Sequence, residues 1–345
     1  MCCQRAPRGD HSEITRYAAR VHVVSTSSLP IDLAAQITAA IPGATVAVPA
    51  AGHVGLAGVD LREADALICL LLDRIDDAVL AAAPRLRVVA NCAVGVDNID
   101  LAACARRGVV VANTPDVLTE ATAELAFALM LAVARRLGEG ERLVRSGGWS
   151  GWALDQLLGV QLLGKTIGIV GFGRIGQAMA RRARGFGMHV IYASPREVAL
   201  RGSGWGDEPL RRVDLDTLFR EADVVSLHCP LTPETYRLVD ARRLALMKPT
   251  GILVNTARGA CVDEAALVEA LAHGRLFGAG LDVYVGEPEI HPDLRSCPRL
   301  VLAPHIGSAT TEARTAMAQL CADAVIAVLS GRRPENLVAA PGERA

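Results

Sequence analysis

The sequence lacks a hydrophobic run long enough to cross a membrane. Such a helix needs roughly 20 consecutive apolar residues, whereas the longest candidate, residues 123–133, contains Glu124 and is soon followed by Arg135 and Arg136. The sequence also lacks an excess of charge, because 36 basic and 37 acidic residues are interspersed along it. That balance provides no basic surface for nucleic acid or an anionic membrane. We therefore expect a soluble protein with neither kind of partner.

Cysteine and histidine motifs are missing as well. The nine cysteines include no CxxC pair and no histidine partner at metal-binding spacing, so we expect reduced thiols and no metal site. The first 20 residues are polar and charged and contain no apolar core of a signal peptide. These features favour a cytoplasmic protein in which residues 1–20 are a disordered extension.

From residue 21 onward, short apolar strands alternate with helical patterns, which is typical of an α/β fold. The length suggests two domains. We expect strands at 21–24, 45–48, 66–72, 87–90 and 109–112, and then at 166–170, 189–193, 224–228, 251–255, 278–282 and 300–303. Helical patterns between and after them include 31–40, 75–83, 119–136, 175–185, 264–273 and 311–329.

These patterns predict two Rossmann-like, doubly wound parallel-sheet domains. The last helix follows a complete set of strands and is free to return to the first domain, which would make that domain discontinuous. We assign residues 21–116 and 310–345 to a flavodoxin-like substrate domain and residues 117–309 to an inserted NAD(P)-binding domain.

A glycine-rich turn between strand 166–170 and the next helix carries the dinucleotide fingerprint GxGxxG. Its first glycine permits a tight turn, its second lets backbone amides approach a pyrophosphate, and its third lets the helix pack on the strand. The amide groups at the helix start favour phosphate binding. The motif consists of Gly171, Phe172, Gly173, Arg174, Ile175 and Gly176.

The acid that grips the adenosine ribose of NAD, expected about 20 residues after the glycines, is absent. The second strand is followed instead by Ser194, Pro195 and Arg196. A hydroxyl and a guanidinium at this place suit a 2′-phosphate, so we expect NADP(H) to be preferred. The alternative is an exposed loop in an enzyme that uses NAD(H).

Three further segments place polar residues just after strands, where doubly wound folds build their sites. They contain Asn255 to Arg258, Asp282 to Glu287, and His305. With the glycine motif and residues 114–119 and 147–149, they make the chain resemble the D-isomer-specific 2-hydroxyacid dehydrogenases over residues 21–338, particularly the glyoxylate/hydroxypyruvate reductase branch. The resemblance implies a homodimer that reduces a small 2-keto acid, such as glyoxylate or hydroxypyruvate, to the D-2-hydroxy acid.

The resemblance also implies a catalytic trio of Arg258, Glu287 and His305. Arg258 suits a bidentate pair with the substrate carboxylate. His305 would donate a proton to the keto oxygen, and Glu287 would fix its tautomer and favour the imidazolium. Taken singly, an arginine before a glycine could simply cap a strand end. An isolated Glu-Pro is usually a surface turn, and a histidine after a proline is more often structural than catalytic.

Further positions follow from the resemblance. Val94 and Gly95 are expected to bind the substrate carboxylate through backbone amides. Trp149 either reaches the substrate pocket of the partner subunit or packs at the dimer interface. Asp282 is expected at the nicotinamide carboxamide. The remaining expected cofactor contacts are Thr122, His228, Cys229, Pro230, Thr256, Ala257, Arg258, His305 and Gly307.

Other activities remain open on the same scaffold. An NAD-dependent enzyme on this scaffold could instead oxidise phosphite or a different D-2-hydroxy acid, including D-3-phosphoglycerate, whereas Glu287 argues against formate oxidation. A dinucleotide-binding transcriptional corepressor is the alternative from a different class of protein. The segment around Asp116 and Trp149 favours the reductase.

Overall fold

The computed structural model describes residues 20–201, 205, 210–297 and 299–338, which form two compact units. The first unit contains the described residues up to Cys92, residues 98–113 and the chain from Leu320 onward. The second contains residues 93–97 and 114–319. Apart from Arg20, the expected disordered extension over residues 1–20 lies outside the described residues.

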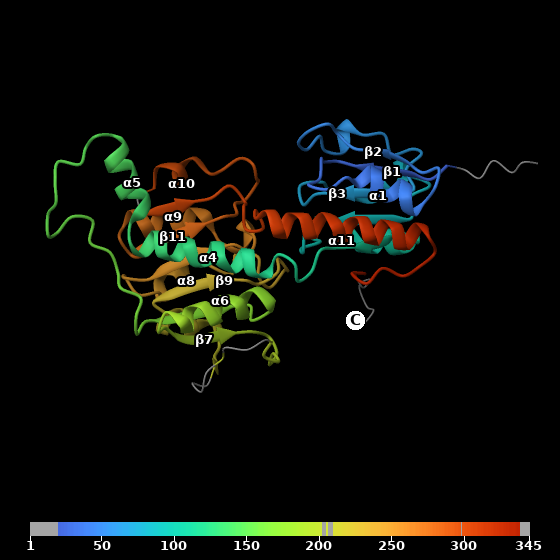
Figure 1. Cartoon of the computed structure of the whole chain (residues 1–345). Coiled ribbons are helices and arrows are strands. Elements are labelled where there is room, and N and C mark those ends of the chain that lie inside the picture. Colours follow the sequence, from blue (N-terminus) through green and yellow to red (C-terminus); the bar gives the residue numbers. More distant parts are fainter. Residues whose placement is uncertain (1–19, 202–204, 206–209, 298, 339–345) are drawn as a thin grey trace, which may run out of the picture. The chain divides into compact units, whose positions relative to one another are not determined.

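A five-stranded parallel sheet forms the centre of the first unit (Figure 1). Its strand order is β2-β1-β3-β4-β5. Strands β3 and β4 are buried throughout, as their largely apolar sequences predict. The strands are β1 (His22–Ser25), β2 (Thr45–Ala47), β3 (Ala66–Cys69), β4 (Val88–Asn91) and β5 (Val110–Ala112).

Aspartates begin the helices of this unit. Asp32, Asp76 and Asp100 each accept a hydrogen bond from a first-turn amide, which satisfies one otherwise unpaired donor. The helices are α1 (Leu33–Ala40), α2 (Asp77–Ala82) and α3 (Leu101–Arg106), with a 3₁₀ turn η1 (Leu56–Gly58).

The end of the chain belongs to the first unit, so this unit is discontinuous. Helix α11 (Thr311–Leu329) places Cys321, Val325 and Val328 in the same core as Val23 and Ile37. The amide of Val338 then donates to the carbonyl of Val111 at 2.8 Å. The prediction of an inserted second α/β domain is therefore confirmed.

The second unit contains a seven-stranded parallel sheet in the order β12-β11-β10-β9-β6-β7-β8. The chain runs from β6 to β8 in one direction and then from β9 to β12 in the other, so the order reverses beside β6. Doubly wound sheets bind ligands at the carboxyl ends of the strands at such a point. The strands are β6 (Thr166–Val170), β7 (His189–Ala193), β8 (Arg211–Arg212), β9 (Val224–Leu227), β10 (Ile252–Asn255), β11 (Gly278–Leu281) and β12 (Leu300–Leu302).

Helices cover this sheet, and α4 contacts α6 and β11 (Figure 1). The sequence predicted six strands here and missed β8, which is only two arginines long. The helices are α4 (Thr119–Ala134), α5 (Leu137–Arg145), α6 (Arg174–Gly185), α7 (Leu215–Glu221), α8 (Ala241–Leu246), α9 (Glu264–Ala272) and α10 (Pro292–Ser296), with a 3₁₀ turn η2 (Gly259–Cys261). Among the described residues, no helix is long and apolar enough to span a membrane.

Candidate active site

The turn from β6 to α6 is built from glycines because side chains would not fit. Gly171 has a φ of +87°, and a Cβ there would lie 2.6 Å from the amide nitrogen of Cys229. A Cβ on Gly176 would meet the carbonyl oxygen of Gly171 and lie 3.0 Å from Ile169. At Gly173, by contrast, a Cβ would meet no atom within 4 Å. The start of α6 therefore faces open space, which suits the approach of a pyrophosphate.

The other residues of the glycine motif pack around this turn. Phe172 is buried and stacks on Tyr192 of β7, with ring centroids 4.1 Å apart. Ile175 is half-buried. Arg174 pairs with Asp116, which has a positive φ. The sequence did not predict that Arg174 is engaged by an acid of its own chain.

Residues 194–196 follow β7 at the same edge of the sheet. The amide of Gly171 donates to the carbonyl of Ala193 at 2.9 Å, which places the two strand ends side by side. Ser194 is half-buried, whereas Pro195 and Arg196 are exposed.

His228, Cys229 and Pro230 follow β9, next to the glycine turn. The imidazole Nε2 of His228 lies 2.8 Å from Oγ of Ser226. Burial lowers the pKa of His228 to about 4, so this histidine is neutral near pH 7 and is no proton donor there. A hydrogen bond with Cys261 and burial both raise the pKa of Cys229, which leaves it a thiol rather than a nucleophilic thiolate.

Two threonines lie among the expected cofactor contacts. Thr256 follows β10, and its hydroxyl is buried without a hydrogen-bond partner among the described residues. Such an orphaned group is unusual in a folded protein and fits a ligand contact. Thr122, in α4, is buried, and a Cβ added to Gly307 would lie 3.4 Å from its Cγ2.

Asn255 fixes the turn that carries Arg258. Its side-chain oxygen accepts from the amide of Ala257 at 3.0 Å, and its amide nitrogen donates to the carbonyl of Arg258 at 2.9 Å. The Arg258 guanidinium donates from Nε and Nη2 to Asp97 and from Nη1 to the carbonyl of Ala257. Burial disfavours a charged Asp97, but the bonds and charge of Arg258 outweigh it, so the pKa of Asp97 is lowered.

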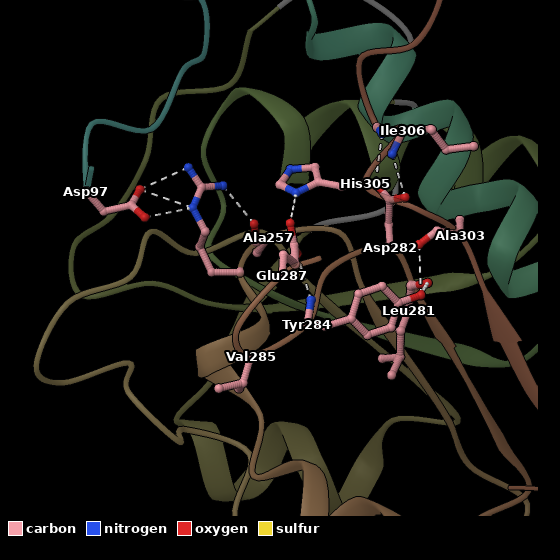
Figure 2. A network of polar contacts seen from close by, with 12 residues as sticks. Asp97, Ala257, Leu281, Asp282, Tyr284, Val285, Glu287, Ala303, His305 and Ile306 are labelled. Atoms are coloured by element: carbon pink, nitrogen blue, oxygen red, sulfur yellow. Dashed lines mark hydrogen bonds and ion pairs between the residues drawn. The ribbon is translucent and has the colours of Figure 1, made fainter. Parts of the chain in front are cut away.

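His305 is held by Glu287 (Figure 2). Nδ1 of His305 lies 2.6 Å from Oε2 of Glu287, whose other oxygen accepts from the amide of Tyr284 at 2.8 Å. Glu287 is therefore fixed at both oxygens, and Nε2 of His305 has no hydrogen-bond partner among the described residues. The sequence did not identify Glu264, a buried carboxylate that accepts from the amide of Val285 at 2.8 Å.

Asp282 holds the turn that carries His305. Its two oxygens accept from the amides of Ile306 and Gly307, both at 2.7 Å, and its carbonyl accepts from the amide of His305 at 2.9 Å (Figure 2). Burial raises the pKa of Asp282 although these donors oppose the shift. The expected nicotinamide contact of Asp282 stays a prediction, and the structure adds this positioning role.

The structure brings some predicted residues together and leaves others apart. Asp97 bonds Arg258 and also lies within electrostatic range of His305, which links the three expected catalytic positions. Val94 is exposed, and a Cβ on Gly95 would lie 2.9 Å from Cζ of Arg258. Trp149 is 54% exposed after α5. In the described part of the chain, no hydrogen bond or ring contact joins it to the catalytic positions.

Comparisons with known proteins show which family the chain resembles. Residues 127–307 match the sequence model of the D-isomer specific 2-hydroxyacid dehydrogenase, NAD binding domain. A glyoxylate reductase of Thermococcus litoralis is 52% identical over 282 residues, which cover 81% of this chain and 84% of that protein. One of Pyrococcus furiosus is 52% identical over 284 residues, with 81% and 83% covered.

Solved structures show the same likeness. A protein of Thermus thermophilus has a TM-score of 0.84 at 46% identity, covering 92% of this chain and all of that one. The NADPH-dependent glyoxylate/hydroxypyruvate reductase of Sinorhizobium meliloti, in complex with NADP and malonate, has a TM-score of 0.80 at 32% identity, covering 94% and 99%. Given the matched domain and relatives about half identical over four fifths of its length, the chain belongs to the D-isomer specific 2-hydroxyacid dehydrogenase family.

Proposed function

We propose that the protein is an NADP(H)-preferring reductase that converts a small 2-keto acid, such as glyoxylate or hydroxypyruvate, to the D-2-hydroxy acid. The observation that carries this proposal is the 2.6 Å bond between His305 and Glu287 near the Arg258–Asp97 pair. A proton donor held by a carboxylate, close to a cation, suits a substrate that has a carboxylate beside a carbonyl group. In this proposal, the first unit is the substrate domain and the second is the nucleotide-binding domain.

Arg258 is prepared to bind the substrate carboxylate. A guanidinium has five N–H donors, and the bonds to Asp97 and Ala257 engage Nε, Nη2 and Nη1. One N–H on each terminal nitrogen remains for a bidentate pair with a carboxylate. Asp97 thereby holds the guanidinium plane, and the backbone at Gly95 lies against it.

His305 is the proposed general acid. A bound reduced nicotinamide supplies the hydride that reaches the carbonyl carbon. Nε2 of His305 donates a proton to the keto oxygen as its negative charge develops, and Glu287 stabilises the positive ring through Nδ1. Positioned proton transfer of this kind contributes about 10²–10⁴ in rate.

The reaction is tested with variants of the two groups that touch the substrate. We expect Arg258→Ala to raise KM for the keto acid and to lower kcat, and His305→Ala to lower mainly kcat. Arg275→Ala and His273→Ala, at exposed positions, are the matched controls. Chiral analysis of the product from hydroxypyruvate is expected to give the D-isomer. Near-parental kinetics of either active-site variant, or an L-product, contradicts the assignment.

The cofactor proposal rests on residues of this chain that fit a dinucleotide. The glycine turn leaves space at the start of α6, and the buried Thr256 hydroxyl has no partner among the described residues. Ser194 and Arg196 offer a hydroxyl and a guanidinium where a 2′-phosphate would lie. Fluorescence titration should give a lower Kd for NADPH than for NADH. The reverse order removes the proposed preference.

We also propose a homodimer. Large apolar side chains are exposed on α5 and on the segment after it, and exposed apolar patches of this kind mark protein interfaces. Light scattering of the purified protein tests the dimer, and a monomer at assay concentration contradicts it. The exposed side chains include Val144, Trp149, Trp152, Leu154 and Leu158.

A further inference from the structure

The loop that follows β7 is held at both ends by side chains outside it. Gln177, which directly follows the glycine motif, is 1% exposed. Its Nε2 donates to the carbonyl of Ala199 at 3.0 Å, and its Oε1 accepts from the amide of Arg201 at 2.8 Å. Arg212 of β8 holds the other end. Residues 196–198 therefore form the middle of a loop that is tied to the nucleotide turn on one side and to β8 on the other.

Arg212 binds this loop through its main chain. Nε donates to the carbonyl of Ser194 at 3.0 Å, and Nη2 donates to the carbonyls of Ser194 and Pro195, both at 2.8 Å. The pairing of Arg212 with Tyr192 in the sheet places the guanidinium beside the strand end. Carbonyl oxygens are neutral, so these bonds fix the guanidinium without cancelling its charge. Among the described residues, no hydrogen bond engages Nη1.

The charge of Arg212 matters because the loop residues next to it, 194–197, have no net positive charge. Arg196 and Glu197 are adjacent and exposed, and their charges are opposite. The loop side chains at 194–197 are therefore neutral overall near pH 7. A phosphomonoester carries about −1.5 to −2 charges at pH 7, and Arg212 is a cation outside residues 194–197 that is bonded directly to Ser194 and Pro195.

We propose that Arg212 is a specificity-determining residue for the 2′-phosphate of NADP(H). It fixes the backbone at Ser194 and Pro195, so that the Ser194 hydroxyl and Arg196 are presented together, and it supplies the positive charge that Glu197 removes from the loop. This inference rests on the proposed NADP(H) preference and adds a residue that lies 16 positions beyond Arg196 in the sequence.

Arg211 provides the matched control. It is the other residue of β8, and successive strand residues point to opposite faces. Its guanidinium pairs with Glu221 instead of the loop. Arg211→Gln and Arg212→Gln thus remove the same charge from adjacent exposed positions, and only the second removes the bonds to the loop.

Binding of cofactor fragments tests the proposal without turnover. We expect Arg212→Gln to weaken binding of adenosine 2′,5′-bisphosphate about tenfold in calorimetry, equivalent to about 1.4 kcal/mol. Binding of adenosine 5′-monophosphate should change less than about twofold, because a monophosphate lacks the group that Arg212 recognises. Arg211→Gln should leave both fragments within about twofold of the parent.

Steady-state kinetics gives a second readout. In Arg212→Gln, KM for NADPH should rise about tenfold while kcat and KM for NADH stay unchanged. Arg212→Lys keeps the charge but loses the planar fork, and should recover part of the NADPH affinity. The inference is overturned if Arg212→Gln behaves like Arg211→Gln while the parent prefers NADPH. A parent that prefers NADH overturns both the cofactor proposal and this inference, before any variant is examined.

Discussion

An added methyl group at Gly95 tests whether the fit of Arg258 against the backbone controls activity. A Cβ there would lie 2.9 Å from Cζ of Arg258 and 2.8 Å from Oδ1 of Asp97. Gly95 has no positive φ, so alanine introduces no backbone strain at this position. The guanidinium is the end of a flexible, partly exposed side chain and has to move. We therefore expect Gly95→Ala to fold as the parent does and to misplace Arg258.

The size of the effect follows from the bonds that depend on Arg258. A hydrogen bond to a charged group contributes about 1.5–3 kcal/mol. Loss of one or two bonds to the substrate carboxylate costs about 2–4 kcal/mol, or about 30- to 1,000-fold in kcat/KM for the keto acid. KM for NADPH should rise less than KM for the keto acid, because Arg258 is only one of many expected dinucleotide contacts.

Initial rates over a range of keto-acid concentrations measure this loss, and circular dichroism checks the fold. Gly185→Ala is the control, since a Cβ at this last position of α6 would meet no atom within 4 Å. A Gly95→Ala enzyme with kcat/KM within about threefold of the parent would refute the assignment of Arg258 as the carboxylate-binding group.

Three further predictions concern the pair of His305 and Glu287, the nucleotide turn, and the dependence of stability on pH. Glu287→Gln should lower kcat about 10- to 100-fold with little change in keto-acid KM, because it removes the charge that stabilises protonated His305. An unchanged kcat in steady-state assays argues against this role of Glu287. Gly176→Ala should weaken NADPH binding in a fluorescence titration, because its Cβ would strike the Gly171 carbonyl; parental affinity contradicts this packing. Burial lowers the pKa of His228 to about 4 from its ordinary 6.5, so as pH falls below 6.5 the unfolded chain takes up a proton that the folded chain does not. The free energy of unfolding should therefore drop by about 2 kcal/mol between pH 7 and pH 5, which urea unfolding measures. A His228→Asn variant should lack this drop. An equal drop in both proteins contradicts the role of His228.

The sequence predicts those parts of the fold that local patterns specify. Largely apolar runs mark β3, β4 and β9. The glycine turn is recognisable because its neighbours are a strand and a helix. Strand β8 was missed because Arg211 and Arg212 carry no apolar signal. They pair with β7 only through backbone hydrogen bonds that a local pattern does not reveal.

In the site as well, the sequence predicts residues that stand in local motifs but not the bonds between residues far apart in the chain. Arg258, Glu287 and His305 stand in recognisable motifs, but the bond between Arg258 and Asp97 joins residues 161 positions apart. From the sequence, Glu264 is an ordinary acidic residue in the first turn of a helix. Acidic residues are favourable and usually exposed at this position. Its burial and its bond to Val285 follow from tertiary packing and were not predictable from the helix pattern.

Initial rates with NADPH and with NADH, each measured with glyoxylate and with hydroxypyruvate, test the proposed NADP(H)-preferring reductase most directly. We expect rapid oxidation of NADPH with a kcat/KM at least about tenfold higher than with NADH, a difference of about 1.4 kcal/mol. A preference for NADH would keep the reductase but contradict the roles of Ser194 and Arg196. Absence of turnover with both cofactors would contradict reduction of glyoxylate and hydroxypyruvate. It would favour phosphite or another keto acid as the substrate, or a dinucleotide-binding corepressor.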